Sequence, residues 1–401
     1  MRARVETTIE LIRTITIPDK IKIERYRRVP ELGPKILFFS GGTAIKNTSK
    51  KIITYTHNSI HIITPFDSGG SSAKIRDSFR MISVGDLRNR LMALADQSVK
   101  GNHDIYKLFS YRLPENLENE ELINKLYEII LGKDQLIAAI PDPMKGIISN
   151  HLRYFVNKMP LDFNLKGANI GNLILTGGYL NNDYNIASVL YIFSRLIEAR
   201  GTVKPVVNSF LHLAAELENG TLLVGQHKLT GKEMEPIQSP VKNVYLADNL
   251  TSPVPVKCPI NTDVISLIKK AEIICYPMGS FYSSIIANLI PDGVGEAVAA
   301  NNCPKIYIPN TAKDPEQLGM DLTKAVTIIC NALIKDNSEL KPNQVLNYIL
   351  IDTENAKYAF DINIQEIEKM SIKVVNTALV TQASFPYIDP ELLIQTLLSL
   401  T

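Results

Sequence analysis

The hydrophobic positions of the chain fall into short uninterrupted runs. The first run is Ile-Leu-Phe-Phe at residues 36–39, and it ends at the glycine pair Gly41 and Gly42. Continuous apolar runs of this length are typical of strands that are buried on both faces, as in a parallel sheet. Further strands are expected at residues 59–64, 203–207, 271–276, 305–309, 348–351 and 372–375.

Segments with helical spacing separate these runs. In residues 84–95, Leu87, Leu91 and Leu94 recur on one helical face, and Asp86 stands where an N-cap is expected. Similar spacing predicts helices at residues 186–200, 261–270, 322–334 and 390–400. Strands that alternate with helices indicate an α/β fold with a doubly wound, mostly parallel sheet.

Two regions inside the chain depart from this alternation. Residues 102–165 are helical and strand-poor, so we expect a helical insertion that packs over the sheet edge and caps a crevice there. Residues 211–217 and 221–226 are expected as strands joined at Asn219 and Gly220, a favoured hairpin turn. A further strand is expected at residues 243–247.

The first 34 residues differ from the rest of the chain. They contain an alternating stretch at residues 14–17 and a basic run at residues 20–28, which is expected as a solvated face. We therefore expect residues 1–34 to form an N-terminal arm or an edge strand. Residues 35–401 are then expected to form one main domain.

Composition and charge exclude several classes of protein. The chain has 401 residues, of which 45% are hydrophobic and 21% charged, as in ordinary soluble globular proteins. A net charge of +2 leaves no extended basic surface for nucleic acid. No apolar run is long enough to cross a membrane and no signal peptide is recognisable, so we expect a cytoplasmic protein without a membrane partner. Four widely spaced cysteines are expected as reduced thiols, and the six histidines show no zinc pattern.

Two glycine turns follow apolar strands. Gly41, Gly42 and Thr43 follow the first strand, and Gly279 and Ser280 follow the strand at residues 271–276. Glycine lets the backbone approach an anion, and the amides at a helix start can bind phosphate, although an ordinary tight turn explains either sequence equally well. Because the full G-x-G-x-x-G spacing is absent, a standard dinucleotide site is disfavoured.

A third segment begins with Asp67, at the end of the second strand. It continues through four small residues, Gly69, Gly70, Ser71 and Ser72, to the cation Arg76. Backbone amides and hydroxyls suit phosphate or ribose oxygens, and Arg76 could neutralise a diphosphate. A flexible linker is the alternative, but the position of the carboxylate at a strand end favours a ligand loop.

Four polar residues lie near the starts of two expected helices. Arg88 and Asn89 fall off the apolar face of their helix, where surface solvation is their ordinary role. Asn169 and Asn172 could bind a ligand with their side-chain amides, but helix capping is the commoner use.

In combination, these segments resemble the CofD/YvcK family, the 2-phospho-L-lactate transferase-like proteins. The resemblance rests on the motifs at residues 40–43, 67–72 with Arg76, 85–89 with 93–96, 167–173, and 278–284 with Asn288. The basic residues 26–28 and the segment 64–67 are most similar to the CofD-like branch of the GAK system.

The resemblance implies a Rossmann-like nucleotide-binding fold and a homo-oligomer. CofD enzymes transfer a phospholactyl group from a guanylyl diphosphate donor to a deazaflavin alcohol with Mg²⁺. YvcK-type relatives bind UDP-sugars and act as regulators. The partner is then a nucleotide or nucleotide-sugar, and the chain is either a CofD-like transferase or a non-catalytic sensor.

The resemblance also assigns roles to residues. Asp67 would hold Mg²⁺ or the acceptor hydroxyl as the catalytic residue, and Arg76 and Arg88 would offset developing charge. The remaining ligand-binding positions would be Gly41, Gly42, Thr43, Gly69, Gly70, Ser71, Ser72, Asp86, Asn89, Asn169, Asn172, Gly279 and Ser280. Family members generally carry paired aspartates where this chain has Asp67 and Ser68. Because Mg²⁺ prefers one or two carboxylates plus phosphate oxygens, a single carboxylate predicts Mg²⁺ binding mainly in the presence of a phosphate ligand.

Overall fold

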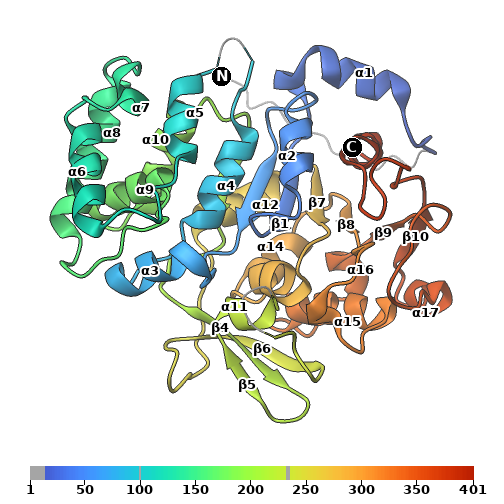
Figure 1. Ribbon diagram of the computed structural model, residues 1–401. Coiled ribbons are helices and arrows are strands. Elements are labelled where there is room, and N and C mark those ends of the chain that lie inside the picture. The colour runs from blue at the N-terminus through green and yellow to red at the C-terminus, as the bar shows by residue number, and fades with distance from the viewer. Residues whose placement is uncertain (1–13, 99–100, 232–234) are drawn as a thin grey trace, which may run out of the picture.

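The computed structural model describes residues 14–98, 101–231 and 235–401 of the chain. Seven parallel strands form a central sheet (Figure 1) in the order β10-β9-β8-β7-β1-β2-β3. The strands are β1 (Ile36–Ser40), β2 (Ile60–Ile63), β3 (Thr202–Pro205), β7 (Ile273–Tyr276), β8 (Lys305–Tyr307), β9 (Tyr348–Ile351) and β10 (Lys373–Asn376). This arrangement confirms the expected α/β, Rossmann-like, doubly wound fold.

Side chains of β1 alternate between two hydrophobic cores. Ile36 and Phe38 pack into the core on one face of the sheet, while Leu37 and Phe39 pack into the core on the other face. All four are at most 1% exposed, which explains why the run is uninterrupted in sequence. A strand that is buried on both faces needs helices on both faces.

Helices cover each face of the sheet. The first face is covered by α2 (Lys46–Ile52), α4 (Gly85–Leu94), α9 (Ile170–Asn181), α10 (Ile186–Leu196) and α18 (Pro390–Ser399). The second face is covered by α12 (Thr262–Lys270), α13 (Ala287–Leu289), α14 (Val294–Ala299), α15 (Leu322–Ile334), α16 (Pro342–Val345) and α17 (Ile364–Glu368). Short helical turns η1 (Pro30–Leu32), η2 (Phe281–Ile286) and η3 (Pro315–Gln317) connect some of these elements.

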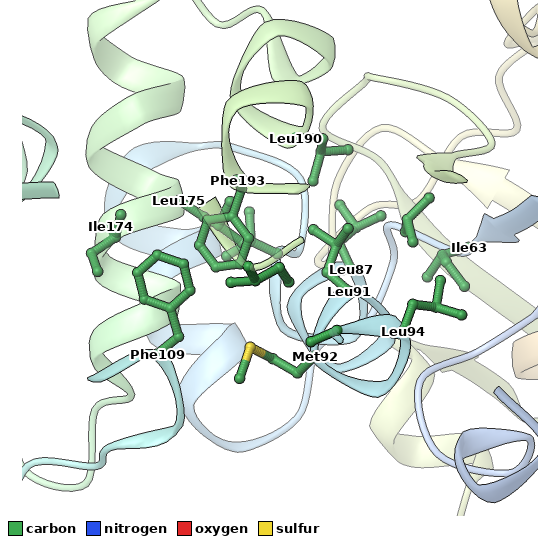
Figure 2. Packing of buried hydrophobic residues seen from close by; sticks show 14 of the residues in the cluster. Ile63, Leu87, Leu91, Met92, Leu94, Phe109, Ile174, Leu175, Leu190 and Phe193 are labelled. Carbon is green, nitrogen blue, oxygen red and sulfur yellow. The ribbon is translucent and has the colours of Figure 1, made fainter. Parts of the chain in front are cut away.

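Helix α4 is anchored to the core by its apolar face. Leu87, Leu91 and Leu94 are at most 1% exposed and pack among side chains of β2, α9 and α10 (Figure 2). The sequence predicted Asp86 as the N-cap, but Val84 holds that position. Asp86 lies inside the first turn of the helix. The apolar anchoring therefore fixes where the polar residues of this turn point.

Residues 102–165 contain four helices and no ladder strand, as expected. These are α5 (His103–Ser110), α6 (Asn119–Ile130), α7 (Gln135–Ala138) and α8 (Met144–Lys158). They form a separate group at one side of the sheet, where α8 packs along α9 (Figure 1). Helix α10 ends at Leu196, earlier than the apolar spacing indicated.

A small antiparallel sheet lies beyond the carboxyl ends of the central strands (Figure 1). Its strands are β4 (His212–Leu217), β5 (Leu222–Val224) and β6 (Val241–Ala247), in the order β5-β4-β6. Gly220 has φ +85° in the expected hairpin turn. The short helix α11 (Gln226–Leu229) follows β5 and contacts η2.

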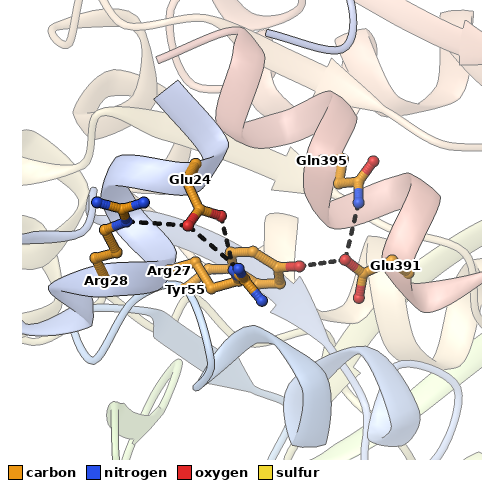
Figure 3. Close-up of polar contacts among 6 residues, drawn as sticks. All are labelled: Glu24, Arg27, Arg28, Tyr55, Glu391 and Gln395. Atoms are coloured by element: carbon orange, nitrogen blue, oxygen red, sulfur yellow. Dashed lines mark hydrogen bonds and ion pairs between the residues drawn. The ribbon is translucent and has the colours of Figure 1, made fainter. Parts of the chain in front are cut away.

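The basic run near the N-terminus forms a helix, α1 (Lys20–Arg28), and residues 14–19 form no strand. The edge-strand alternative is therefore wrong for the described part of the arm. Asp19 explains the helix start: its carboxylate accepts the Lys22 amide at 3.0 Å, while its own amide donates to Ser399 Oγ at 2.8 Å. Glu24 pairs with Arg27 and Arg28 on the exposed side, beside a hydrogen-bond chain that joins Tyr55 to α18 through Glu391 and Gln395 (Figure 3).

Among the described helices, none has the length and apolar character needed to cross a membrane.

Candidate ligand-binding crevice at the strand ends

The direction of chain progression reverses between β1 and β7. From β1 the chain builds the sheet outward through β2 and β3, and from β7 it builds outward on the other side through β8, β9 and β10. In open α/β sheets, ligands bind in the crevice beyond the carboxyl ends of the strands at such a point. A crevice of about 230 Å³ lies here. It is lined by Gly42, Thr43, Ala44, Asp67, Gly69, Asp86, Gln226, His227, Thr230, Ser280 and Ser284.

The cover of this crevice differs from the sequence prediction. Gln226, His227 and Thr230 come from α11 and the residue that follows it, so this short helix after β5 supplies the covering wall. The helices of residues 102–165 contribute no lining residue. The expectation that they cap this crevice is therefore wrong, because the helices pack against α9 at the side of the sheet.

The two glycines after β1 leave room for side chains of the protein itself. A Cβ on Gly42 would overlap the carboxylate of Asp86, and a Cβ on Gly41 would overlap the hydroxyl of Ser284. Neither glycine has a positive φ, so space rather than backbone conformation requires them. The turn thus brings Asp86 and Ser284 next to the carboxyl end of β1.

A buried arginine that the sequence analysis did not single out holds this turn. Arg90, on α4, is fully buried and donates to the carbonyls of Gly41 at 2.8 Å and Ile45 at 3.0 Å. It also donates to Ser49 on α2. From the other side, Asn288 donates to the Ser40 carbonyl at 3.0 Å. Because both contacts hold the backbone at the end of β1, they keep the crevice wall in place. Neither of the two side chains lines the crevice.

Two carboxylates line the crevice, whereas the sequence prediction assigned the metal and the chemistry to Asp67 alone. Asp67 lies within 3.7 Å of a Cβ built on Gly85, and Asp86 lies against Gly42 across the same space. The Gly69 amide donates to Asp67 Oδ1 at 3.1 Å, which orients this carboxylate at the start of α3 (Gly70–Phe79). Asp86 stands in the place where a second carboxylate can act on the same ligand.

The small residues after Asp67 form the first turn of α3. Gly70 has φ +47°, which favours glycine, and no side chain caps the amides of this turn. Ser71 lies within the helix, and Ser72 is buried beneath Gly85, where a Cβ would be 2.6 Å from its hydroxyl. Ser72 thus spaces α3 from α4 and does not line the crevice.

Arg88 is buried without sufficient partners. It is 7% exposed, it donates through Nη2 to Asn89, and its Nε and Nη1 have no hydrogen-bond partner. Burial, and then the charge of nearby Arg112, lower the pKa of Arg88 to about 10, while Asp86 acts in the opposite direction. The expectation of an ordinary solvated role for Arg88 is wrong, because this charge is held inside the protein.

The two asparagines of α9 lie next to this arginine. Asn169 is the N-cap and accepts the Asn172 amide at 3.1 Å, as expected for capping. Asn172 is 2% exposed and its Oδ1 has no partner. A Cβ on Gly171 would be 2.9 Å from the Arg88 side chain, which shows how closely the arginine packs on α9.

Arg76 does not point into the crevice. Its guanidinium donates to the carbonyls of Pro65 and Leu211, both at 2.6 Å, and lies 5.2 Å from the ring centre of Phe210. The residue therefore ties the end of β2 to the start of β4. With its donors used in this way, it is not placed to neutralise a diphosphate in the crevice, contrary to the sequence prediction.

The second glycine turn also has partners inside the protein. The Gly279 amide donates to Asn310 at 2.8 Å, and the Phe281 amide donates to Asp314 at 2.8 Å. The next two amides, of Tyr282 and Ser283, donate to Glu316 at 2.7 and 2.8 Å. The Gly279 amide and the amides of residues 281–283 are therefore occupied by an amide oxygen and by carboxylates.

Glu316 is a further buried group that the sequence analysis did not identify. Burial, and then the charge of Asp314, raise the pKa of Glu316 to about 7, while hydrogen bonds from Ser283 and Tyr282 oppose this rise. Only Ser280 of the predicted turn lines the crevice directly, and Gly279 faces a neighbouring cavity.

The cavity next to the crevice has a volume of about 520 Å³ and shares Ala44 and Ser280 with it. Its lining includes Gly279, Asn310 and Lys313 from the β7 and β8 loops, together with Tyr387 from the segment before α18. Tyr387 is 66% exposed. The two spaces together offer a polar part with carboxylates and a broader part with an accessible aromatic ring.

Comparisons with known proteins agree with this architecture. The family model described as 2-phospho-L-lactate transferase CofD matches residues 36–380. A gluconeogenesis factor from Bacillus subtilis is 25% identical over 356 residues, which cover 87% of this chain and 92% of that protein. A gluconeogenesis factor from Listeria monocytogenes is 27% identical over 286 residues, 70% of this chain and 67% of that protein.

A crystal structure of a UPF0052-family protein from Bacillus halodurans shares the fold. It superposes with a TM-score of 0.65 at 20% sequence identity and covers 90% of this chain and 99% of that one. The family match begins at the first residue of β1 and extends past β10, so it includes every strand and every wall of the crevice. The chain belongs to the CofD family.

Proposed function

We propose that the protein binds a nucleoside diphosphate-type donor in the crevice between β1 and β7 and transfers the group attached to its phosphate to an acceptor hydroxyl, as a 2-phospho-L-lactate transferase-like enzyme. The observation that carries this proposal is the pair Asp67 and Asp86, which lines one crevice at the point where the strand order reverses. Ligand sites of this fold class lie at that point.

The size and division of the space fit a nucleotide. Small-molecule sites commonly have volumes of about 300–1,000 Å³, and the crevice continues into the 520 Å³ cavity through Ala44 and Ser280. The phosphates would lie near the two carboxylates. The nucleoside would lie in the broader cavity, where Tyr387 offers a ring face for stacking.

The residues present fit Mg²⁺ only together with a phosphate ligand. In the described parts of the chain, no cluster of three or more His, Cys, Asp or Glu side chains is suited to hold a metal ion. Asp67 and Asp86 would supply two oxygens, and the donor phosphates would supply others, as is usual for Mg²⁺. A bound Mg²⁺ would neutralise phosphate charge, and without it the two carboxylates would repel a diphosphate.

The residues of the chain would divide the remaining tasks. Arg90 and Asn288 hold the end of β1, so the backbone of Gly42 and Thr43 is fixed against the donor. Asp67, oriented by the Gly69 amide, would hold the acceptor hydroxyl or the metal. The buried, under-partnered Arg88 adds positive potential behind Asp86 and favours an anionic ligand.

A non-catalytic sensor is the second candidate. The relatives from Bacillus subtilis and Listeria monocytogenes are named gluconeogenesis factors, which is not the name of an enzyme activity. The same crevice could bind a nucleotide-sugar such as a UDP-sugar and signal its presence without transfer. In that case the two carboxylates would serve binding only.

Asp67→Asn separates the two candidates. The asparagine keeps the shape but removes the charge needed for a metal or a hydroxyl proton. A transferase would lose turnover while donor binding, measured by thermal shift, is largely retained; a sensor would show a modest change in affinity and no turnover in either form. If guanine, uridine and adenine nucleotides with Mg²⁺ all fail to raise the melting temperature, the nucleotide site itself is wrong, since a ligand at a hundred times its Kd adds about 2.7 kcal/mol.

A further inference from the structure

A histidine of the covering wall is held by a serine of the ligand loop. Ser68 Oγ lies 2.8 Å from His227 Nδ1, and the backbone amide of His227 donates to the same oxygen at 3.3 Å. The two residues are 159 positions apart in the chain, and the small antiparallel sheet brings them together. One hydroxyl thus fixes both the backbone and the ring of His227.

The ring, rather than the serine, faces the crevice. His227 lines the crevice together with Asp67 and Asp86, whereas Ser68 is not part of its lining. Gly225, with φ +103°, makes this placement possible: a Cβ there would be 2.9 Å from His227 Cε1 and 3.2 Å from Ser68 Oγ. Ser68 therefore contacts the imidazole from behind.

The contact with Ser68 permits a tautomer of the imidazole in which Nε2 carries a free lone pair. A hydroxyl oxygen has two lone pairs, so Ser68 Oγ can accept the amide hydrogen and the Nδ1 hydrogen of His227 at the same time. In that arrangement Nδ1 carries the proton and Nε2 carries the free lone pair. The hydrogen bond of one ring nitrogen commonly decides the state of the other.

We propose that His227 is the general base of the transfer, with Ser68 as its positioning residue. Nε2 takes the proton of the acceptor hydroxyl while the acceptor oxygen forms a bond to the donor phosphorus. The bond between this phosphorus and the leaving phosphate oxygen breaks, its electron pair stays on the nucleoside monophosphate, and the proton leaves His227 for solvent. Asp67 lines the same crevice and would hold the acceptor hydroxyl or the metal while His227 takes the proton. The inference rests on the proposed transfer function.

The tautomer can be measured without any ligand. In a protein labelled with ¹⁵N-histidine, long-range ¹H–¹⁵N spectra distinguish a protonated ring nitrogen from one with a free lone pair, and His227→Gln assigns the signal. We expect Nδ1–H for His227, and a shift toward Nε2–H in Ser68→Ala. Ser280→Ala, which removes another hydroxyl of the crevice, should leave the tautomer unchanged, because His227 Nδ1 bonds to Ser68. A wild-type His227 in the Nε2–H form would overturn the proposal.

The second arm tests contact with the ligand. UDP or GDP with Mg²⁺ should shift the His227 signals and leave those of His103, which bonds to the Ser98 carbonyl outside the crevice, unchanged. A thermal shift shows independently whether a nucleotide binds. If a nucleotide that binds leaves the His227 signals unaltered, the proposal is also overturned. If no nucleotide binds, the transfer function fails and the base role with it, while the tautomer result still shows whether Ser68 positions the ring.

With a turnover assay in hand, His227→Gln should lower kcat by roughly a hundredfold or more, with the donor KM little changed, as for the loss of a general base. Ser68→Ala should give a smaller loss in kcat. Equal turnover in wild type and His227→Gln would exclude the base role.

Discussion

Replacing Arg88 by methionine should make the ligand-free protein more stable. Arg88 is 7% exposed, and its Nε and Nη1 have no hydrogen-bond partner among the described residues. Burying a charge without full pairing is unfavourable, and methionine of similar length removes the charge while it keeps the apolar stem. The change therefore removes an unfavourable contribution to the free energy of the folded state.

The lowered pKa of Arg88 gives the size of this cost. Burial lowers the pKa to about 10, with Arg112 acting in the same direction. Because the pKa of the folded state lies below that of the unfolded state, the charge destabilises the folded state at every pH below about 10, including neutral pH. At 1.36 kcal/mol for each pKa unit, the penalty is about 3 kcal/mol. The variant also loses the contacts with Asn89 and Asp86, so we expect a net gain of about 1–2 kcal/mol.

Arg76→Met is the matched control. Burial lowers the pKa of Arg76 to about 10 as well, and its side chain is 1% exposed. Its guanidinium, however, satisfies the carbonyls of Pro65 and Leu211 and lies over Phe210. Removing it takes away this donor from the Leu211 carbonyl, while the Pro65 carbonyl keeps the Ser83 amide. Arg76→Met should therefore lower the free energy of unfolding by about 1–3 kcal/mol.

Urea denaturation of the two variants and the wild type measures both effects under the same conditions. We expect the midpoint to rise for Arg88→Met and to fall for Arg76→Met. In addition, Arg88→Met should weaken the thermal shift produced by a nucleotide with Mg²⁺, because it removes positive potential behind the crevice. Equal destabilisation in both variants would show that Arg88 is satisfied in the folded protein and would refute this reasoning.

Three further predictions concern the crevice and its supports. Gly42→Ala should displace the Asp86 carboxylate, which lies against this glycine. We expect Mg²⁺–nucleotide binding to weaken by about tenfold or more, equivalent to about 1.4 kcal/mol, with little change in circular dichroism. An unchanged affinity by calorimetry would contradict the close contact. The pKa of Glu316 is raised above its unfolded value to about 7, so ionisation of this group destabilises the folded state as pH rises from about 5 to 8. Glu316→Gln should make the free energy of unfolding, measured by urea titration, less dependent on pH in this range. An unchanged slope of that free energy against pH would contradict the prediction. Arg90→Gln leaves the Gly41 carbonyl without its donor and should lower stability by about 2–4 kcal/mol, as measured by urea denaturation, in contrast to Arg88→Met.

The order of strands and helices could be predicted because burial on two faces leaves a direct record in the sequence. The run at residues 36–39 is uninterrupted because its side chains enter two cores in alternation, and the same holds for the run that ends at Tyr276. Helix α1 was not foreseen, although Asp19 and the basic last turn explain it afterwards. The sequence spacing marks which residues are apolar, but it does not mark where a polar stretch will be capped.

The crevice could be predicted only in part, because partners are chosen by tertiary structure. Gly41, Asp67 and Gly279 could be placed at strand ends from the sequence. Of these, Asp67 lines the crevice, whereas the neighbouring Gly42 and Ser280 line it in place of Gly41 and Gly279. The guanidinium of Arg76 donates to the carbonyl of Leu211, which is far away in the sequence. The amides after Gly279 donate to Asp314 and Glu316. Neither contact has a signal in local sequence.

His227 shows the same limit. No motif surrounds it, and it reaches Ser68 only because β4, β5 and α11 fold over the strand ends. Asp86 was recognised as a polar candidate, but its role as a second carboxylate beside Asp67 depends on the close approach of Gly42. A count of carboxylates along the ligand loop alone therefore underestimates what the crevice contains.

Calorimetric titration of a nucleoside diphosphate, with and without Mg²⁺, tests the central claim most directly. The account predicts weak binding of Mg²⁺ alone, weak binding of the nucleotide alone, and tight binding of the two together, because the carboxylates of the crevice would hold Mg²⁺ only together with a phosphate ligand. This binding should weaken about tenfold or more, at least about 1.4 kcal/mol, in Asp86→Asn. Nucleotide binding that is equally tight without Mg²⁺, or unchanged in Asp86→Asn, would contradict the assignment of the crevice between β1 and β7.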